Sequence, residues 1–320
     1  MITPATLAPT PNTDELGLLL EHARTFADAA HAPNTRRAYG AQWRSFVAWC
    51  GALRLRPLPA AADTIALYVA ALDREGLVPA SVDVALAAIA KMHQAHALES
   101  PCTAPAVAAV RAGLRRTRGT VPRQAAPLRI DELLAVVGAI GADLLGLRDR
   151  ALLLLGWCSA VRRSDLVAID VPELVFTGDG AEVFLRRSKT DQEGEGFWIG
   201  VPFALDPAAC PVRAVRAWVD AAGITAGPVF RPLRGRRVLD RRLSDRAVAR
   251  VVQARATAAG LDASRLSGHS LRAGFVTSAA RAGRSERAIM DQTGHRSLKI
   301  VRRYIRRATL FEENAAAGLL

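Results

Sequence analysis

The chain has 320 residues, half of them hydrophobic, with 43 basic against 30 acidic residues and a formal net charge of +13. This length allows two domains with cores of their own, and the apolar content excludes a disordered chain. The excess of basic residues indicates a polyanionic partner. Nucleic acid is favoured over a membrane surface, because every basic amphipathic segment has apolar positions that are expected to pack into the protein's own core.

The N-terminal third predicts a small helical bundle behind a flexible tail at residues 1–13. Asn34-Thr35 is expected to cap a helix whose apolar positions, from Tyr39 to Cys50, recur at helical spacing. Further helices are predicted at 65–72, 82–97 and 104–114, the first starting at Asp63-Thr64 and the second at Ser81. With short loops between them, these helices form a bundle domain over residues 14–116.

Two histidines of this domain, His93 and His96, lie three residues apart on one predicted helix. No third candidate ligand accompanies them, so we interpret both as surface residues. The sequence therefore predicts no metal site here.

Residues 117–127 are the expected linker, since the stretch from Arg115 to Pro127 is basic, contains a glycine and two prolines, and has little to bury. A second domain is expected over 128–320. Two short strands are predicted at 182–186 and 197–201, joined by the polar stretch 191–196. Helices are predicted at 130–140, 147–158, 163–166, 211–221, 245–259, 270–282, 286–293 and 298–304.

The four cysteines, Cys50, Cys102, Cys158 and Cys210, are widely separated and form no CxxC pair, which is typical of reduced thiols. No signal peptide is visible at the N-terminus, and the most apolar run, 151–161, is too short to span a bilayer. We expect a cytoplasmic protein that does not bind a membrane.

The second domain contains candidate groups for cleaving a phosphodiester without a metal. Charge that builds on the phosphate oxygens needs cations, and guanidinium groups supply paired, permanently charged donors. Arg162 is one candidate, and Asp165, three residues later, could hold it. His269 and Arg272 share a face at the start of a predicted helix. The neighbouring glycines, 268 and 274, would allow a phosphate to approach the backbone closely.

Tyr304 is the candidate nucleophile. Tyr39 and Tyr68, the other two tyrosines, lie on apolar helix faces and are expected in the core, whereas arginines at 302, 303, 306 and 307 flank Tyr304. A tyrosine hydroxyl with an ordinary pKa of about 10 needs such a polarised setting to attack. Lys189, near the tip of the two-strand unit and one of three lysines, could protonate the leaving oxygen.

Each of these features alone has an ordinary structural interpretation. His-x-x-Arg could be a helix-capping histidine with a surface arginine, and Arg162 with Asp165 could be a simple helical ion pair. Lys189 could be a solvated turn residue, and Tyr304 could lie on an amphipathic helix with a basic face. The ordered set as a whole favours the catalytic interpretation.

That ordered set resembles the tyrosine recombinase, or phage integrase, family over the chain from about residue 34. The family pattern is Arg…Lys…His-x-x-Arg…His/Trp…Tyr, with an acidic residue after the first arginine. Within the family, residues 35–50, 243–247, 267–272 and 304–306 look most similar to Cre-type recombinases. Ala160 stands where many members have glycine. The pattern falls on Arg162, Asp165, Lys189, His269, Arg272, His295 and Tyr304.

The resemblance implies a mainly α fold, with an N-terminal helical-bundle core-binding domain and an α-rich catalytic domain containing a small antiparallel β-sheet. Arg162, Arg272 and His295 would bind the scissile phosphate. His269 would assist proton transfer from Tyr304, and Lys189 would protonate the leaving 5′-hydroxyl. Tyr304 would become a 3′-phosphotyrosine that stores the bond energy, so no ATP, metal or other cofactor is implied; Lys189-Thr190 also lacks the glycine pattern of a Walker A motif.

Double-stranded DNA carrying an inverted-repeat site is the implied partner, held in a clamp by the two domains. Helices at 36–50 and 81–97 are candidates for the major groove. Arg246 matches a base-reading arginine of Cre-type enzymes and suits a bidentate contact to guanine. The other candidate DNA contacts are Arg36, Arg37, Lys91, Arg115, Arg116, Arg118, Arg241 and Arg242.

We expect a site-specific recombinase of phage, plasmid or other prokaryotic origin, associated with the nucleoid and working through a Holliday junction. A monomer in solution would form a homotetramer on two DNA sites, with the apolar tail 315–320 docked on a neighbouring protomer. A type IB topoisomerase-like enzyme, which uses the same chemistry as a monomer, is one alternative. A catalytically silent DNA-binding protein is another, although every catalytic position is filled.

Overall fold

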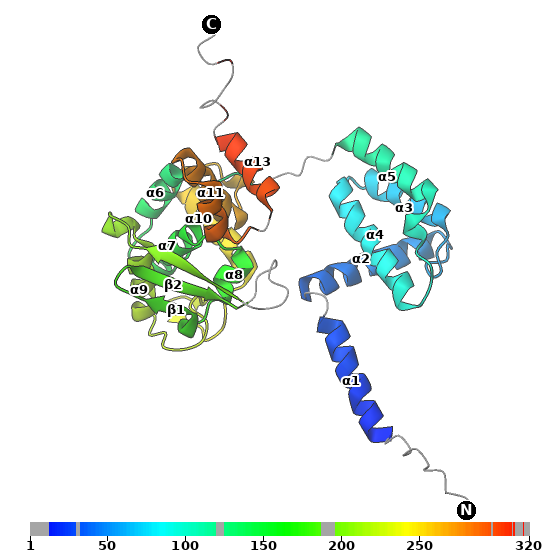
Figure 1. Ribbon diagram of the computed structural model, residues 1–320, viewed down its shortest axis with the longest axis horizontal. Coiled ribbons are helices and arrows are strands. Elements are labelled where there is room, and N and C mark those ends of the chain that lie inside the picture. The colour runs from blue at the N-terminus through cyan, green and yellow to red at the C-terminus, as the bar shows by residue number, and fades with distance from the viewer. Residues whose placement is uncertain are drawn as a thin grey trace, which may run out of the picture. The chain divides into compact units, whose positions relative to one another are not determined.

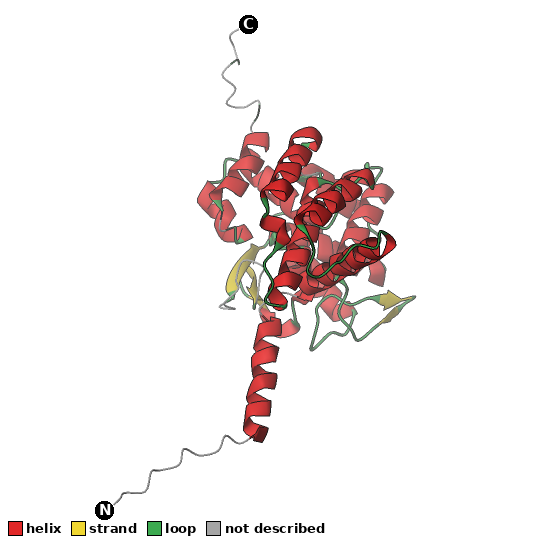
Figure 2. Cartoon of the chain, turned by 90° about the vertical axis from the view of Figure 1, so that its right-hand side faces the viewer, coloured by secondary structure: helices red, strands yellow, loops and turns green. Residues whose placement is uncertain are grey.

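The computed structural model describes residues 13–29, 33–119, 125–186, 196–295 and 297–308, together with Leu310 and Ala316. The chain divides into two compact units, Met1–Arg123 and Gln124–Leu320 (Figure 1). Within the described ranges the chain is mainly helical, with a three-stranded antiparallel sheet and a two-stranded one (Figure 2). This confirms the predicted fold class. No helix among these residues is long and apolar enough to cross a membrane.

The first unit consists of helices. They are α1 (Thr13–Ala29), α2 (Pro33–Ala52), α3 (Ala62–Arg74), α4 (Pro79–Ala95) and α5 (Pro105–Arg118), with a single 3₁₀ turn at Pro101–Thr103. Three of these helices begin at a proline, which suits the first helical position because its missing N–H is not needed there. The expected starts at Asn34 and Ser81 were therefore late, and α1 was not among the predicted helices.

An aromatic cluster forms the centre of the first unit's core. The ring centroid of Tyr68 lies 4.9 Å from that of Phe46 and 5.0 Å from that of Trp49. Tyr68 is 1 % exposed, as expected for a core residue, whereas Tyr39 is only partly buried. Pairs of this kind stabilise a core beyond the area that they bury.

The interpretation of His93 as a surface residue was wrong, whereas His96 is exposed. His93 is fully buried, and its Nε2 accepts a hydrogen bond from Ala60 N at 3.0 Å. Its Nδ1 lies 2.9 Å from Ile89 O, to which it donates in the neutral tautomer. Because both ring nitrogens have backbone partners, the side chain is buried without an unpaired polar atom.

The second unit carries the strands β1 (Leu174–Phe176), β2 (Gly180–Leu185) and β3 (Phe197–Pro202) in the order β1-β2-β3, and the hairpin β4 (Leu233–Arg234) and β5 (Arg237–Val238). Strands β2 and β3 pair with Val183 opposite Ile199, and both of these side chains face the core. The helices are α6 (Ile130–Gly138), α7 (Leu144–Cys158), α8 (Arg163–Ala168), α9 (Pro211–Ala221), α10 (Asp245–Ala258), α11 (His269–Arg281), α12 (Glu286–Thr293) and α13 (Leu298–Ala308).

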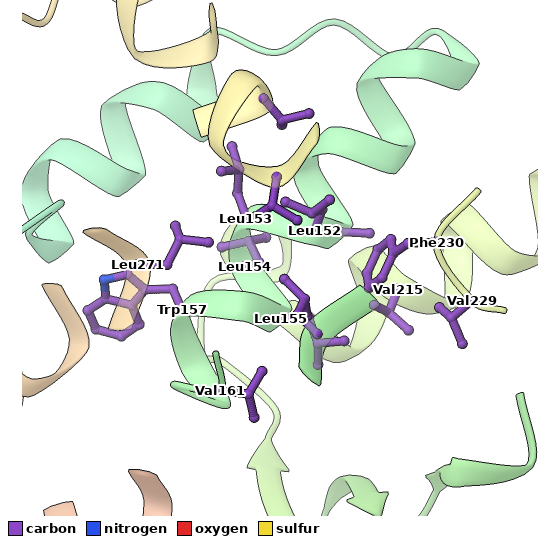
Figure 3. Packing of buried hydrophobic residues seen from close by; sticks show 14 of the residues in the cluster. Leu152, Leu153, Leu154, Leu155, Trp157, Val161, Val215, Val229, Phe230 and Leu271 are labelled. Carbon is purple, nitrogen blue, oxygen red and sulfur yellow. The ribbon is translucent and has the colours of Figure 1, made fainter. Parts of the chain in front are cut away.

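Helix α7 is the central element of this unit. Its run Leu152–Leu155 is at most 2 % exposed on every side, and Figure 3 shows these leucines packed among Val215, Phe230 and Leu271. A helix that is apolar all round can be stable only when other elements surround it. The residues that follow α7, from Ser159 onward, are therefore attached to a helix that is packed on all sides.

Helix α11 is fixed against the segment that enters the unit. Leu128 N donates to Ser270 O, and Leu128 O accepts from Trp157 Nε1, both at 3.0 Å. A Cβ atom on Gly274 would lie 1.7 Å from Leu128 O. The glycine at 274 thus admits a protein carbonyl and not a phosphate, so that interpretation was wrong. At Gly268, likewise, a Cβ would meet the side chain of Arg163 at 3.1 Å.

Replacing Gly274 with alanine is expected to destabilise the second unit by about 3 kcal/mol, because the backbone of Leu128 would have to move away from α11. Urea unfolding followed by tryptophan fluorescence would measure the change. Gly138→Ala is the matched control, since nothing lies within 4 Å of a Cβ there, and it should leave stability unchanged or slightly higher. Equal unfolding midpoints for wild type and Gly274→Ala would contradict the packing argument.

Candidate active site

Helix α13 places Tyr304 against α11 and α12. Val301 is fully buried in a small cluster with Val276 and Ile289, and the rings and chains of Tyr304 and Ile305 pack against that cluster. The next residue after Val301, Arg302, reaches α12 as well: its Nε donates to both carboxylate oxygens of Glu286, at 3.0 and 3.2 Å. The amphipathic pattern of the helix therefore turns the tyrosine inward and leaves Arg302, Arg303 and Arg306 exposed.

The hydroxyl of Tyr304 lies 3.4 Å from Nε2 of His269, the first residue of α11. The pKa of His269 is lowered, first by loss of hydration around the ring and then by the charges of Arg272, Arg162 and Arg163. The ring is consequently neutral near pH 7. A neutral imidazole at this distance is placed to receive the phenolic proton when the hydroxyl attacks.

Arg272 is the buried cation of the site, with 3 % exposure. Its Nη1 donates to Ala160 O at 2.7 Å, whereas its buried Nη2 has no partner in the described part of the chain. Burial, followed by the charge of Arg162, lowers the pKa of Arg272 to about 10, so the group is still charged at neutral pH. A charged, buried guanidinium with an open donor is suited to an anion.

Ala160 forms a tight turn between α7 and α8. Its φ of 52° lies in the left-handed region, and its side chain is fully buried. That conformation costs an L-residue roughly 1–2 kcal/mol, which explains why glycine suits this position in the family pattern. The turn points the carbonyl of Ala160 at Arg272 and leads directly to Arg162.

Arg162 precedes α8, and its Nη1 lies 3.7 Å from Oδ2 of Asp165. Asp165 is 8 % exposed and accepts a 3.0 Å hydrogen bond from Ser164 Oγ. Burial raises the pKa of Asp165, against the opposing effects of Ser164, Arg162 and Arg272. The carboxylate thus orients Arg162, as the spacing in the sequence predicted.

His295 follows the end of α12. Gly294 closes that helix in the left-handed conformation with φ of 62°, and a Cβ there would lie 2.9 Å from the ring of Phe197. The Nδ1 of His295 lies 2.6 Å from Thr293 Oγ1, which fixes the ring. Burial, then Arg272, Arg162 and His269, lowers the pKa of His295 to about 3.

The structure brings together six of the seven predicted residues of the site. Contacts or electrostatic interactions join Arg162, Asp165, His269, Arg272, His295 and Tyr304. Lys189 lies outside the described residues. Among those that are described, no group of three or more His, Cys, Asp or Glu side chains could hold a metal ion.

The predicted DNA contacts divide by their partners. Arg115 pairs with Asp83, Arg118 with Asp73, and Arg242 with Asp170, and Arg37 donates to the Asn34 side chain. The others, Arg36, Lys91, Arg116, Arg241 and Arg246, are exposed. Sequence analysis did not single out the β4–β5 hairpin, although Arg234, Arg236 and Arg237 around the Gly235 turn are exposed as well.

The model of the phage integrase family matches residues 127–310, which include every candidate residue of the site. The chain belongs to the phage integrase family. It is 37 % identical over 309 residues to an integrase/recombinase XerD homolog of Selenomonas ruminantium, covering 95 % of this chain and 89 % of that protein. A tyrosine recombinase of Synechococcus elongatus is 31 % identical over 316 residues, 93 % of this chain and 90 % of the relative.

Solved structures support the same fold. A lambda integrase fragment (75–356), crystallised as a dimer bound to a COC′ core site, matches with a TM-score of 0.60 and 20 % identity, over 90 % of this chain and 93 % of that one. XerH bound to a palindromic difH substrate matches with a TM-score of 0.57 and 15 % identity, over 81 % and 71 %. The family match and the two relatives make the protein a tyrosine recombinase, a DNA strand transferase of site-specific recombination. The finer likeness to Cre-type members stays a prediction.

Lowering the pH from about 7 to about 5 should destabilise the second unit through His295. Its folded pKa of about 3 lies below the unfolded value of about 6.5, so the unfolded state binds more protons in between and stability falls as the pH falls. Thermal melting of His295→Gln should therefore depend less on pH than melting of the wild type. Parallel slopes for wild type and His295→Gln would contradict this assignment.

Proposed function

We propose that this recombinase cuts and rejoins DNA at inverted-repeat sites through a 3′-phosphotyrosine on Tyr304, as a tetramer that passes through a Holliday junction. One observation carries the proposal. The Tyr304 hydroxyl lies 3.4 Å from His269 Nε2, on the same helix face as a buried Arg272 whose Nη2 is open. A nucleophile, a neutral base and a cation for the phosphate are thus side by side.

In the first step, the Tyr304 oxygen forms a bond to phosphorus and its proton passes to His269 Nε2. The bond between phosphorus and the 5′-oxygen breaks, and Lys189 gives that oxygen its proton. His269 suits the first transfer because its lowered pKa keeps Nε2 free to accept. The reverse step, with a 5′-hydroxyl as nucleophile, restores the phosphodiester and frees the tyrosine.

Charge on the equatorial phosphate oxygens is met by Arg162, Arg272 and His295. Arg272 contributes its open Nη2, Arg162 a guanidinium oriented by Asp165, and His295 a ring fixed by Thr293. These donors are in place before the substrate arrives, so little reorganisation opposes the transition state. Removing one such donor typically slows a reaction about 10²–10³-fold.

Exchange between two sites, and hence the tetramer, is supported by an apolar groove of about 530 Å³ in the second unit. Trp157, Phe275, Ala279 and Ile289 line it, with Arg284 among the few polar groups. We assign its occupant as the C-terminal segment of a neighbouring copy, because that segment ends in the apolar run 315–320. A lambda integrase tetramer bound to a Holliday junction matches this chain with a TM-score of 0.58 and 20 % identity.

The DNA interface is proposed to include the exposed arginines of the β4–β5 hairpin and of the start of α10. Arg246 lies in the first turn of α10, where it can reach a base edge. Arg234, Arg236 and Arg237 have the exposure expected of phosphate contacts. Arg242 donates hydrogen bonds to Val167 O and Asp170, and we assign it to fixing the loop before α10 against the end of α8.

Incubating the protein with fragmented DNA from its source and quenching with SDS should trap protein covalently attached to DNA. The Tyr304→Phe variant should give no adduct but should still bind DNA, because only the attacking oxygen is lost. Sequencing the trapped ends would identify the site. Tight binding without any wild-type adduct would favour a catalytically silent DNA-binding protein. Relaxation of supercoiled DNA by a monomer, without exchange between two sites, would favour the topoisomerase alternative.

Once the site is known, Arg246→Ala should weaken binding by about 1–3 kcal/mol and relax the preference at one base pair. Arg236→Ala should weaken binding equally on all sequences and lower the salt slope of log K by about one. Fluorescence anisotropy at several salt concentrations measures both. Arg242→Ala is the control, and it should leave the salt slope of log K at the wild-type value. An unchanged sequence preference in Arg246→Ala would remove it from the base-reading contacts.

A further inference from the structure

Gln292, in the last turn of α12, joins three segments of the second unit through one amide group. Its Nε2 donates to Cys158 O at 2.8 Å and to Gly200 O at 3.0 Å. Cys158 ends α7 and Gly200 lies in β3, which among the described strands has a neighbour only on its β2 side. Both acceptors are carbonyls that their own elements leave open, so both amide protons of Gln292 are used.

The turn that follows Cys158 contains Arg162 and accepts a hydrogen bond from Arg272 of α11. Ala160 O accepts from Arg272, and Arg162 leaves the same turn two residues later. Gln292 bonds to the start of this turn and is followed, three residues on, by His295. The turn from Cys158 to Arg162 therefore helps to position all three groups: it contains Arg162, binds Arg272 directly and binds the helix end that precedes His295.

We propose that Gln292 is a positioning residue that sets His295 in register with Arg162 and Arg272, an inference that rests on the phosphoryl-transfer function proposed above. The bond to Cys158 O ties the end of α12 to the turn, and its loss lets that end of the helix shift. The ring of His295 then loses its fixed distance from the two guanidinium groups. A shift of one side chain within such a set slows the chemistry far more than it weakens binding.

The chemistry of the two acceptors makes the amide specific. A carboxylate at 292 would face two carbonyl oxygens without a proton to donate, so Gln292→Glu should be as damaging as removal. Methionine has a similar length and fills the same space, but it donates nothing. Gln292→Met thus removes the two hydrogen bonds with little change in packing.

The test is the single-turnover rate of covalent adduct formation on the cognate site, measured with DNA affinity, thermal stability and assembly on the same DNA. Gln292→Met should form adduct on the order of tenfold more slowly, with wild-type affinity and assembly. In a His295→Ala background the same substitution should slow the reaction less than about twofold, because its target is already absent.

Ser285→Ala is the matched control, because Ser285 Oγ accepts from Ala288 N and caps the other end of the same helix. This variant removes the N-terminal cap of α12 without touching Cys158 or Gly200. It should keep the wild-type rate. If Ser285→Ala slows the reaction as much as Gln292→Met, general stability of α12 is responsible and the positioning role fails.

Two further outcomes overturn the inference. A full tenfold loss in the His295→Ala background would show that Gln292 acts elsewhere. A reaction rate that falls in parallel with assembly on DNA would indicate that Gln292 acts through the apolar groove, which it also lines. Failure of the proposed function is distinct from both, since it would appear as a wild-type protein that forms no adduct at all.

Discussion

The hydrogen bond from Arg272 to Ala160 O is the contact on which the rest of the site depends. A guanidinium at 3 % exposure is costly to bury unless its donors are paired, and here one is paired and another is open. The fold sustains this arrangement because α11 is locked to Leu128 through Gly274, and because α7 is packed on all sides. The acceptor carbonyl points toward Arg272 because Ala160 adopts a left-handed conformation at the end of α7.

The cations and the nucleophile are held with different strength. Arg162 lies in the turn after α7, and Arg272 of α11 donates to the same turn; both segments contribute residues to the main core of the unit. Tyr304 belongs to α13, whose buried contacts are a small separate cluster and whose ion pair, Arg302 with Glu286, is 53 % and 38 % exposed. An exposed pair contributes about 1 kcal/mol at most. The phosphate site is thus rigid, while the helix that carries the attacking group is the more easily displaced part.

Sequence patterns predicted what depends on periodicity and on residue order. The helical spacing gave α2 to α13 except for their ends, and the order of Arg162, His269, Arg272, His295 and Tyr304 pointed to one site. What escaped prediction depends on contacts between distant segments. His93 is buried because the chain at Ala60 returns to it, and Gly274 is needed because Leu128 crosses α11. The bonds of Gln292 to Cys158 and Gly200 join residues 134 and 92 positions apart, which no local pattern encodes.

The energetic features of the site distinguish a catalytic site from one that is merely retained. Its unfavourable features are concentrated in one place. They are the open Nη2 of Arg272, the left-handed Ala160, the buried carboxyl of Asp165 and two histidines whose pKa values are lowered first by burial and then by neighbouring positive charge. Each lowers the stability of the free chain, and each could be relieved by a single substitution without altering the surface that meets DNA. A protein that only bound DNA would gain stability from such substitutions and lose nothing, whereas one that must stabilise a phosphoryl-transfer transition state needs all of them together.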